Sequence, residues 1–224
     1  HTAQNMDGIY FRNWVEKRWT GNFTVSWWTM IIDITKELFV LIFILGLLLS
    51  CFLKKRLQLQ TRYWVILSFL VYVICLAKIT LFPVYFFSDE DLRQMKEGVD
   101  SYFAFYQPIP LASIRNYLHE GALLQLIGNF LLLSPLSVYT EIFTRGKWKT
   151  GKKIALLAFV SVMIEALQLL LNVVSGFPAR TADIDDFFLN TSGALLTLVI
   201  LVLFRKMFRN HEHFKEALDS LFYD

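Results

Sequence analysis

The residues best suited to chemistry lie in the segment 165–190, EALQLLLNVVSGFPARTADIDDFFLN. Glu165 could act as a general acid or base, and the planar guanidinium of Arg180 suits a phosphate or a carboxylate. Asp183 and Asp186 could hold that guanidinium, begin a helix or bind a cation. Ionisable groups are costly inside a membrane and usually serve a purpose there, so this segment predicts a functional site in an otherwise apolar chain.

Composition places the chain among helical membrane proteins. Hydrophobic residues make up 55% of it and charged residues only 18%, whereas about a quarter of a soluble domain is charged. The net charge of +3 gives no reason to expect a nucleic-acid partner. Cys51 and Cys75 both lie in apolar runs without a His or Cys at metal-ligand spacing, so we expect neither a disulfide framework nor a cysteine metal site. No cofactor is expected.

Five apolar stretches predict one all-α, polytopic membrane domain over residues 30–208, with spans at about 30–53, 63–85, 121–143, 154–174 and 186–208. Residues 1–29 carry four tryptophans and predict an N-terminal interfacial segment, or a mobile tail with an aromatic anchor. Residues 209–224 are expected to be a juxtamembrane tail. The connection 86–120 is rich in aromatic residues after Ser101, which favours a loop that lies in the membrane interface or re-enters the membrane.

The distribution of positive charge predicts the orientation. The loops 54–62 and 144–153 carry four and five Lys or Arg residues, whereas 86–120 carries three and 175–185 carries one. The positive-inside rule therefore places the N-terminus outside the cell and the C-terminus in the cytoplasm. The segment around Arg180 and the aromatic connection then share the extracytoplasmic face.

Three polar residues fall at one depth in the predicted spans. Helix rise places Lys78, Asn129 and Glu165 roughly 10–15 Å below the outer boundary. Lys78 and Glu165 are formal charges of opposite sign well inside these spans, so we expect them to face each other or a common wet cavity. Gln168 lies one turn outward from Glu165 on the same helix face, and Asn190 lies just inside the fifth span.

Structural roles compete with binding roles at several positions. A Lys78–Glu165 pair could fix helix register, although a buried pair stabilises little unless it is well hydrogen-bonded. Asn129 and Gln168 could join helices through hydrogen bonds. Asp185 is best interpreted as an ordinary acid at a helix N-terminus.

Two dipeptides and one loop are expected to be structural only. Ser134-Pro135 predicts a kink, and Gly193-Ala194 predicts close helix packing. The basic loop 145–153 is expected to set topology and to contact anionic lipid.

Three segments together resemble the VanZ-like family of bacterial membrane proteins. NFLLLSPLS follows Ile127-Gly128, EALQ begins at Glu165, and RTADIDDFFLNTSGA begins at Arg180. KITLFP from Lys78 and PIPL from Pro108 add to a resemblance that covers about residues 63–204. The positions that match the family's motifs are Asn129 with Pro135, Glu165 with Gln168, Arg180 with Asp183 and Asp186, and Asn190 with Gly193. The chain departs from the pattern at Ser134, where a bulky aromatic residue is commoner, and in its longer N-terminal region.

This resemblance implies a protein of the bacterial cytoplasmic membrane, because the namesake is linked to teicoplanin-type glycopeptide resistance at the cell envelope. The partners it implies are a membrane lipid, a lipid-linked cell-wall precursor or the glycopeptide itself. Our first hypothesis is an accessory binding protein that holds an anionic headgroup in an outward-facing polar cavity. The binding residues would be Lys78, Asn129, Gln168, Arg180, Asp183, Asp186 and Asn190.

The alternative hypothesis is a membrane-embedded enzyme that modifies a lipid or a lipid-linked sugar. Glu165 would be its general acid or base, Arg180 and Lys78 would stabilise anionic oxygens, and Asp183 and Asp186 would orient them or hold a divalent metal. The sequence shows no nucleophile with a base beside it, which favours binding or metal-assisted chemistry. A transporter or flippase ranks last, because the sequence shows no inverted halves or paired broken helices.

Overall fold

The computed structural model describes residues 30–32, 44, 61–90, 92–93, 105–144 and 147–208. The predictions for residues 1–29, for most of the first span and for the tail 209–224 therefore lie outside the described residues. Within the described part of the chain, four spans are long and apolar enough to cross a membrane. These spans are Trp64–Leu81, Leu123–Thr144, Thr150–Ser175 and Ile184–Met207. The protein is thus an all-α, multi-pass membrane protein, as its composition predicts.

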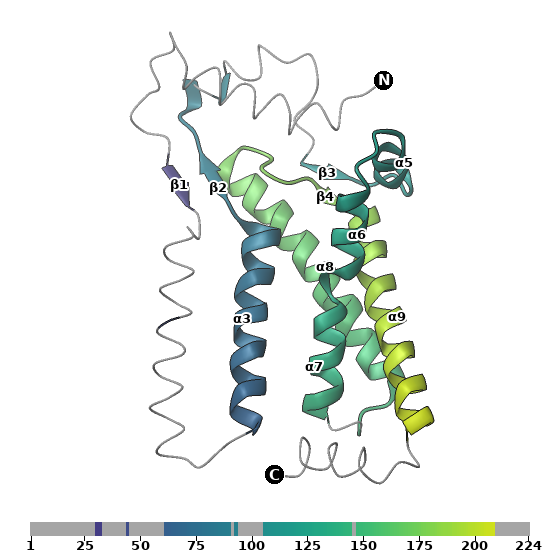
Figure 1. Ribbon diagram of the computed structural model, residues 1–224. Coiled ribbons are helices and arrows are strands. Elements are labelled where there is room, and N and C mark those ends of the chain that lie inside the picture. Colours follow the sequence, from purple (N-terminus) through teal and green to yellow (C-terminus); the bar gives the residue numbers. More distant parts are fainter. Residues whose placement is uncertain are drawn as a thin grey trace.

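The described spans are built from five helices. Figure 1 shows α6 and α7 stacked end to end between α3 and α9, with α8 crossing behind them. The helices are α3 (Thr61–Leu81), α6 (Leu123–Leu132), α7 (Ser134–Thr144), α8 (Thr150–Ser175) and α9 (Ile184–Phe208). The fourth and fifth predicted spans agree with α8 and α9 within a few residues. The second predicted span, 63–85, extends beyond the end of α3 at Leu81. Pro83 has no N–H to continue the helix, and it disfavours helical backbone at Phe82, the residue before it.

The third predicted span is present as two helices rather than one. α6 ends at Leu132 and α7 begins at Ser134, so the predicted kink at Ser134-Pro135 takes the form of a break at Leu133. A proline ring clashes with the carbonyl four residues earlier, which accounts for the break. The hydroxyl of Tyr72 on α3 donates to the carbonyl of Leu132 at 3.0 Å and so satisfies a backbone group near the break.

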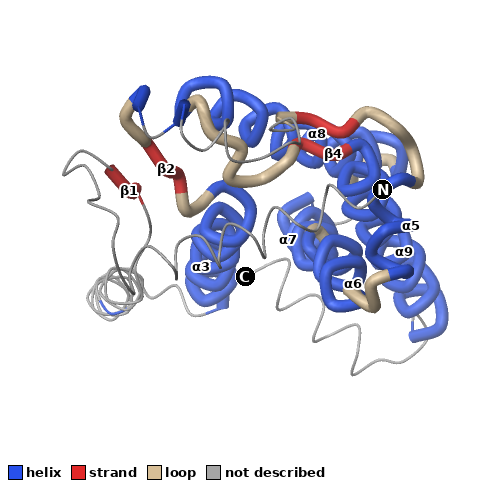
Figure 2. The backbone as a smooth tube through the Cα atoms, turned by 90° about the horizontal axis from the view of Figure 1, so that it is seen from above, coloured by secondary structure: helices blue, strands red, loops and turns tan. Residues whose placement is uncertain are grey.

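The end of the bundle that carries the short helix α5 (Ala112–His119) also carries two small β-ladders. The strand β1 (Met30–Ile32) pairs antiparallel with β2 (Val84–Phe86), and β3 (Tyr106–Gln107) pairs parallel with β4 (Ala182–Asp183). Residues 30–32 and 84–85 are therefore strand, which corrects the predicted helical spans at those positions. The pairing of β3 with β4 ties the aromatic connection to the segment that precedes α9 (Figures 1 and 2). Its depth in the membrane stays a prediction.

The core lies where α6, α7, α8 and α9 meet. Its buried apolar residues are Leu133, Leu157, Ile164, Ala194 and Leu198. The outward faces of the helices carry exposed apolar side chains such as Leu124 and Val173, as expected for surfaces that meet lipid. The backbones of α6 and α9 lie close together at Gly193, where an added Cβ would lie 1.6 Å from the carbonyl oxygen of Phe130. The predicted close packing at Gly193 is confirmed.

Replacing Gly193 with alanine is expected to destabilise the bundle, because α9 must move away from the Phe130 backbone to make room for the methyl group. Overpacking of this kind costs about 1–3 kcal/mol, and backbone is less able to give way than a side chain. Thermal unfolding of the purified protein in detergent measures the loss. Gly128→Ala is the matched control on α6, since nothing lies within 4 Å of its added Cβ and alanine favours a helix. Equal unfolding midpoints for the two variants would contradict this packing.

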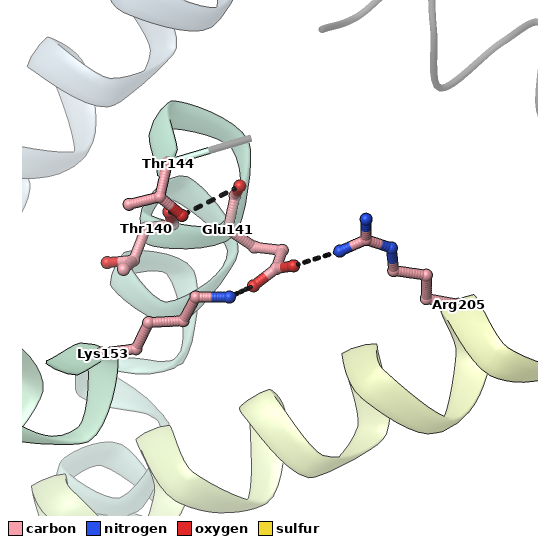
Figure 3. A network of polar contacts seen from close by, with 5 residues as sticks. All are labelled: Thr140, Glu141, Thr144, Lys153 and Arg205. Carbon is pink, nitrogen blue, oxygen red and sulfur yellow. Dashed lines mark hydrogen bonds and ion pairs between the residues drawn. The ribbon is translucent and has the colours of Figure 1, made fainter. Parts of the chain in front are cut away.

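The opposite end of the bundle is held by an ion-pair network (Figure 3). Glu141 on α7 accepts a hydrogen bond from Lys153 on α8, and its other oxygen accepts from Arg205 Nη1 on α9 at 3.0 Å. The side chains of Lys153 and Glu141 are 6% and 14% exposed, whereas that of Arg205 is 55% exposed. The sequence predicts that Lys153 belongs to a basic loop, and the pair of Lys153 with Glu141 was not predicted. Both residues lie within one turn of a helix end, where charged residues are usually exposed.

Candidate functional site

Asp185 lies in the first turn of α9, as predicted, but its carboxylate serves a different helix. Oδ1 accepts a hydrogen bond from Leu111 N at 2.6 Å, and Oδ2 accepts from Ser113 N at 2.9 Å and from Ile114 N at 3.2 Å. These amides open α5, where a helix leaves its first N–H groups without partners of its own. Asp185 is fully buried and therefore fixes α5 and the preceding loop onto α9.

Asp183 lies beside this cap and orders the turn from β4 into α9. Its Oδ1 accepts a hydrogen bond from Asp185 N at 2.9 Å, and it also accepts one from the Ser113 side chain. Burial raises the pKa of the Asp183 carboxyl, although both hydrogen bonds act in the opposite direction. This predicted site residue is thus engaged with the backbone and with the α5 segment.

Glu165 and Asp186 meet around β4. Oε2 of Glu165 accepts a hydrogen bond from Asp183 N at 2.8 Å, and Oδ1 of Asp186 accepts one from Asn129 Nδ2. The Asn129 contact joins α6 to α9, so the interhelical role weighed for this residue is present. The direct pairing of Glu165 with Lys78 stays a prediction. A wet cavity shared by the two stays a prediction.

Gln168 and Arg180 both reach the free end of α3. Gln168 Nε2 donates to the carbonyl of Thr80 at 3.0 Å, and Arg180 Nη2 donates to that of Phe82 at 3.4 Å. The last carbonyls of a helix have no partner in their own helix, and Pro83 cannot supply an N–H here. Gln168 therefore also ties the end of α3 to α8, and Arg180 ties it to the loop before β4.

Two further residues of this region, Asn172 and Tyr117, were not predicted from the sequence. Asn172 is buried on α8, and its Nδ2 donates to the carbonyls of Arg180 at 2.5 Å and Phe105 at 3.3 Å, which fixes the loop before β4. Its position four residues after Gln168, on the same helix face, was the available signal. Tyr117 on α5 interacts electrostatically with Asp186, and no spacing in the sequence indicates this. Burial, together with the charges of Asp186 and Asp183, raises the pKa of the Tyr117 phenol.

A small recess lies between the end of α3, the last turns of α8 and the loop that carries Arg180. Its volume is about 10 Å³, enough for about one water-sized group. Gln168 is buried, and no group in the described part of the chain donates a hydrogen bond to its Oε1. The lining residues are Thr80, Leu81, Val84, Gln168, Leu171, Asn172, Ser175, Ala179 and Arg180.

The structure therefore divides the predicted site residues into two groups. Gln168 and Arg180 line the recess. Glu165, Asp183 and Asp186 lie around β4 together with Asn129, and these four residues are called the carboxylate cluster. Asn190 is 1% exposed, and its Oδ1 has no hydrogen-bond partner. It lies one turn below Asp186 on the same face of α9, and so at the inner edge of the carboxylate cluster. The binding role expected of Lys78 stays a prediction.

The chemistry that these groups offer is hydrogen bonding and charge. Within the described ranges, no group of three or more His, Cys, Asp or Glu side chains is placed to hold a metal ion. Arg180 is an exposed cation at the edge of the recess, and the carboxylates of Glu165, Asp183 and Asp186 lie deeper.

Comparison with known families agrees with the motifs. A model of the VanZ/LLP1 family matches residues 69–205. The chain belongs to the VanZ/LLP1 family. No curated protein and no solved structure matches the chain. The matched range of the VanZ/LLP1 model includes both groups of site residues and confirms the resemblance over nearly all of residues 63–204.

Proposed function

We propose that this VanZ/LLP1-family protein is a binding protein of the bacterial cell envelope. It holds the anionic headgroup of a membrane lipid, or of a lipid-linked cell-wall precursor, at the outer face of the cytoplasmic membrane. The observation that carries the proposal is that the Arg180 side chain is exposed and has few hydrogen-bond partners among the described residues. Among the described residues, its exposed guanidinium makes one long hydrogen bond, to Phe82 O at 3.4 Å, so most of its five N–H donors have no partner there and could bind a ligand. Planar guanidinium groups bind phosphate and carboxylate well.

The positive charges at the far end of the bundle support the orientation that this function needs. Lys147, Lys149, Lys152 and Lys206 all lie where α7 ends, α8 begins and α9 ends, and all are exposed. By the positive-inside rule this end faces the cytoplasm, with the C-terminus. The α5 end, with Arg180 and the recess, then faces outside, and the N-terminus lies outside as well.

The family supports the setting. The resemblance to VanZ-like proteins links the chain to teicoplanin-type glycopeptide resistance. Glycopeptides, lipid-linked wall precursors and outer-leaflet lipids all meet the membrane on the outer side. Binding of such a headgroup near Arg180 would place the protein where this class of drug acts.

Replacing Arg180 with glutamine is expected to weaken binding of phosphatidylglycerol by about ten- to a hundredfold. This follows from the roughly 1.5–3 kcal/mol of a hydrogen bond to a charged group. Arg180→Lys should retain part of the affinity, since it keeps the charge and loses the planar fork. Native mass spectrometry of the detergent-purified protein with added lipid measures the bound fraction. Arg115→Gln, which removes another exposed arginine at the same end, is the control. Equal binding by the Arg180 and Arg115 variants would rule out the proposed site.

An enzyme is the second candidate, and the position of Glu165 favours it. Only one oxygen of this half-buried carboxylate accepts a hydrogen bond from a described residue, so the other could exchange a proton with a ligand. Incubation of the wild-type protein with the lipid that it binds separates the two functions. A new lipid product that Glu165→Gln abolishes would favour the enzyme. Binding without any product would favour the accessory protein.

A further inference from the structure

The buried amide groups near Arg180 leave acceptors unused. Among the described residues, two buried amide oxygens have no hydrogen-bond partner, Gln168 Oε1 and Asn190 Oδ1. Amide oxygens only accept hydrogen bonds. The hydroxyls of Ser134 and Thr191 are also without partners, but a hydroxyl can donate or accept. The two atoms that need a hydrogen-bond donor are therefore Gln168 Oε1 on α8, in the recess, and Asn190 Oδ1 on α9, beside the carboxylate cluster.

Gln168 presents its free oxygen where a small group could reach it. Its Nε2 donates a hydrogen bond to Thr80 O, which fixes the orientation of the amide. Oε1 is then the amide atom that accepts no hydrogen bond from a described residue. Gln168 is 8% exposed and lines the same recess as Arg180. The recess holds about one water-sized group. A primary ammonium group has about this size and brings three N–H donors and no acceptor.

The charges beneath the recess have the sign that would attract such a group. Glu165 lies three residues before Gln168 on α8, on the same helix face, and interacts electrostatically with Asp183 and Asp186. Arg180 is the cation at the exposed edge of the recess. The carboxyl groups of this region therefore lie on the side toward Glu165, and the guanidinium of Arg180 lies at the exposed edge.

We propose that the anionic phosphate held at Arg180 belongs to an aminoalkyl phosphate headgroup of the phosphatidylethanolamine type, which also carries an ammonium group. Its phosphate binds Arg180 at the exposed edge, and its ammonium enters the recess and donates to Gln168 Oε1, in the field of Glu165. The phosphate half of this assignment rests on the proposed function. The ammonium half is new and is carried by the unpartnered acceptor, the size of the recess and the acidic charge beneath it.

Competition between lipids tests the ammonium half without changing the protein. Wild-type protein is titrated with phosphatidylethanolamine, phosphatidylglycerol and N-acetylated phosphatidylethanolamine, and bound lipid is counted by native mass spectrometry. Phosphatidylethanolamine should bind about tenfold more tightly than either lipid that lacks the ammonium. Phosphatidylcholine should bind weakly, because its quaternary nitrogen has no N–H and is too large for the recess. Equal or tighter binding of phosphatidylglycerol would overturn the inference.

Two variants separate this inference from the proposed function. Glu165→Gln keeps an oxygen for Asp183 N but removes the charge, so the preference for phosphatidylethanolamine over phosphatidylglycerol should fall about fivefold. Glu120→Gln removes an exposed carboxylate at the same end and should leave that preference unchanged. An unchanged preference in Glu165→Gln would overturn the ammonium site. If Arg180→Gln still weakens both lipids, the proposed function stands; if it weakens neither, both proposals fail.

Discussion

Asp185→Ala is expected to release α5 from the bundle and to lower the free energy of unfolding by about 3–5 kcal/mol. The carboxylate accepts three backbone hydrogen bonds, from Leu111, Ser113 and Ile114, and no other acceptor replaces it in alanine. Buried amides without a partner lose their hydration and gain nothing in return. Thermal unfolding measures the total loss. Hydrogen exchange of the amides in α5 shows where the loss occurs.

Two controls make this result specific. Asp89→Ala removes an exposed aspartate, so it should change neither the unfolding midpoint nor the exchange of α5. Asp185→Asn keeps one amide oxygen, so it should fall between the wild type and alanine. If Asp185→Ala behaved like Asp89→Ala, the cap would not hold α5, and the link between this segment and the start of α9 would have to come from β3 and β4 alone.

The helices follow from local signals in the sequence. Apolar runs of spanning length place α8 and α9 within a few residues, and Ser134-Pro135 marks the break between α6 and α7. Gly193-Ala194 marks the close contact between α6 and α9. Each of these depends on a few neighbouring residues, through the missing N–H of proline or the missing Cβ of glycine.

The partners of the polar residues do not follow from local signals. Asp185 binds amides that are 71 to 74 positions earlier, and Gln168 binds a carbonyl 88 positions away. Sequence placed Lys78 and Glu165 at one depth, but depth does not fix the direction in which a side chain points around its helix. Glu165 turns to Asp183 N because β4 passes close to α8 at that position.

These contacts share one physical cause. Backbone that leaves helical geometry in or near a membrane must find hydrogen-bond partners inside the protein. Asp185, Gln168 and Asn172 supply them at the start of α5, the end of α3 and the loop before β4. Much of the polarity that first suggests a ligand site therefore holds the chain together. What remains for a ligand is the guanidinium of Arg180, Gln168 Oε1 and the carboxylate cluster, which is why the proposals rest on these groups.

Glu141→Leu is expected to destabilise the far end of the bundle by about 3–5 kcal/mol, because it leaves the buried ammonium of Lys153 without its partner. Arg205→Ala should cost no more than about 1 kcal/mol, since the Arg205 side chain is 55% exposed and its pair with Glu141 is screened by solvent. Unfolding of each purified variant in the same detergent measures the difference.

The double variant Glu141→Leu with Lys153→Met decides whether burial of an unpaired charge causes the loss. Removing both charges leaves apolar side chains of similar volume between α7 and α8, and such replacements of buried pairs are often neutral or stabilising. The double variant should therefore recover most of the stability that Glu141→Leu loses. If it were as unstable as the single variant, the pair would contribute through its specific geometry, and Lys153 and Glu141 would be fixing the register of α8 against α7 and not merely neutralising each other.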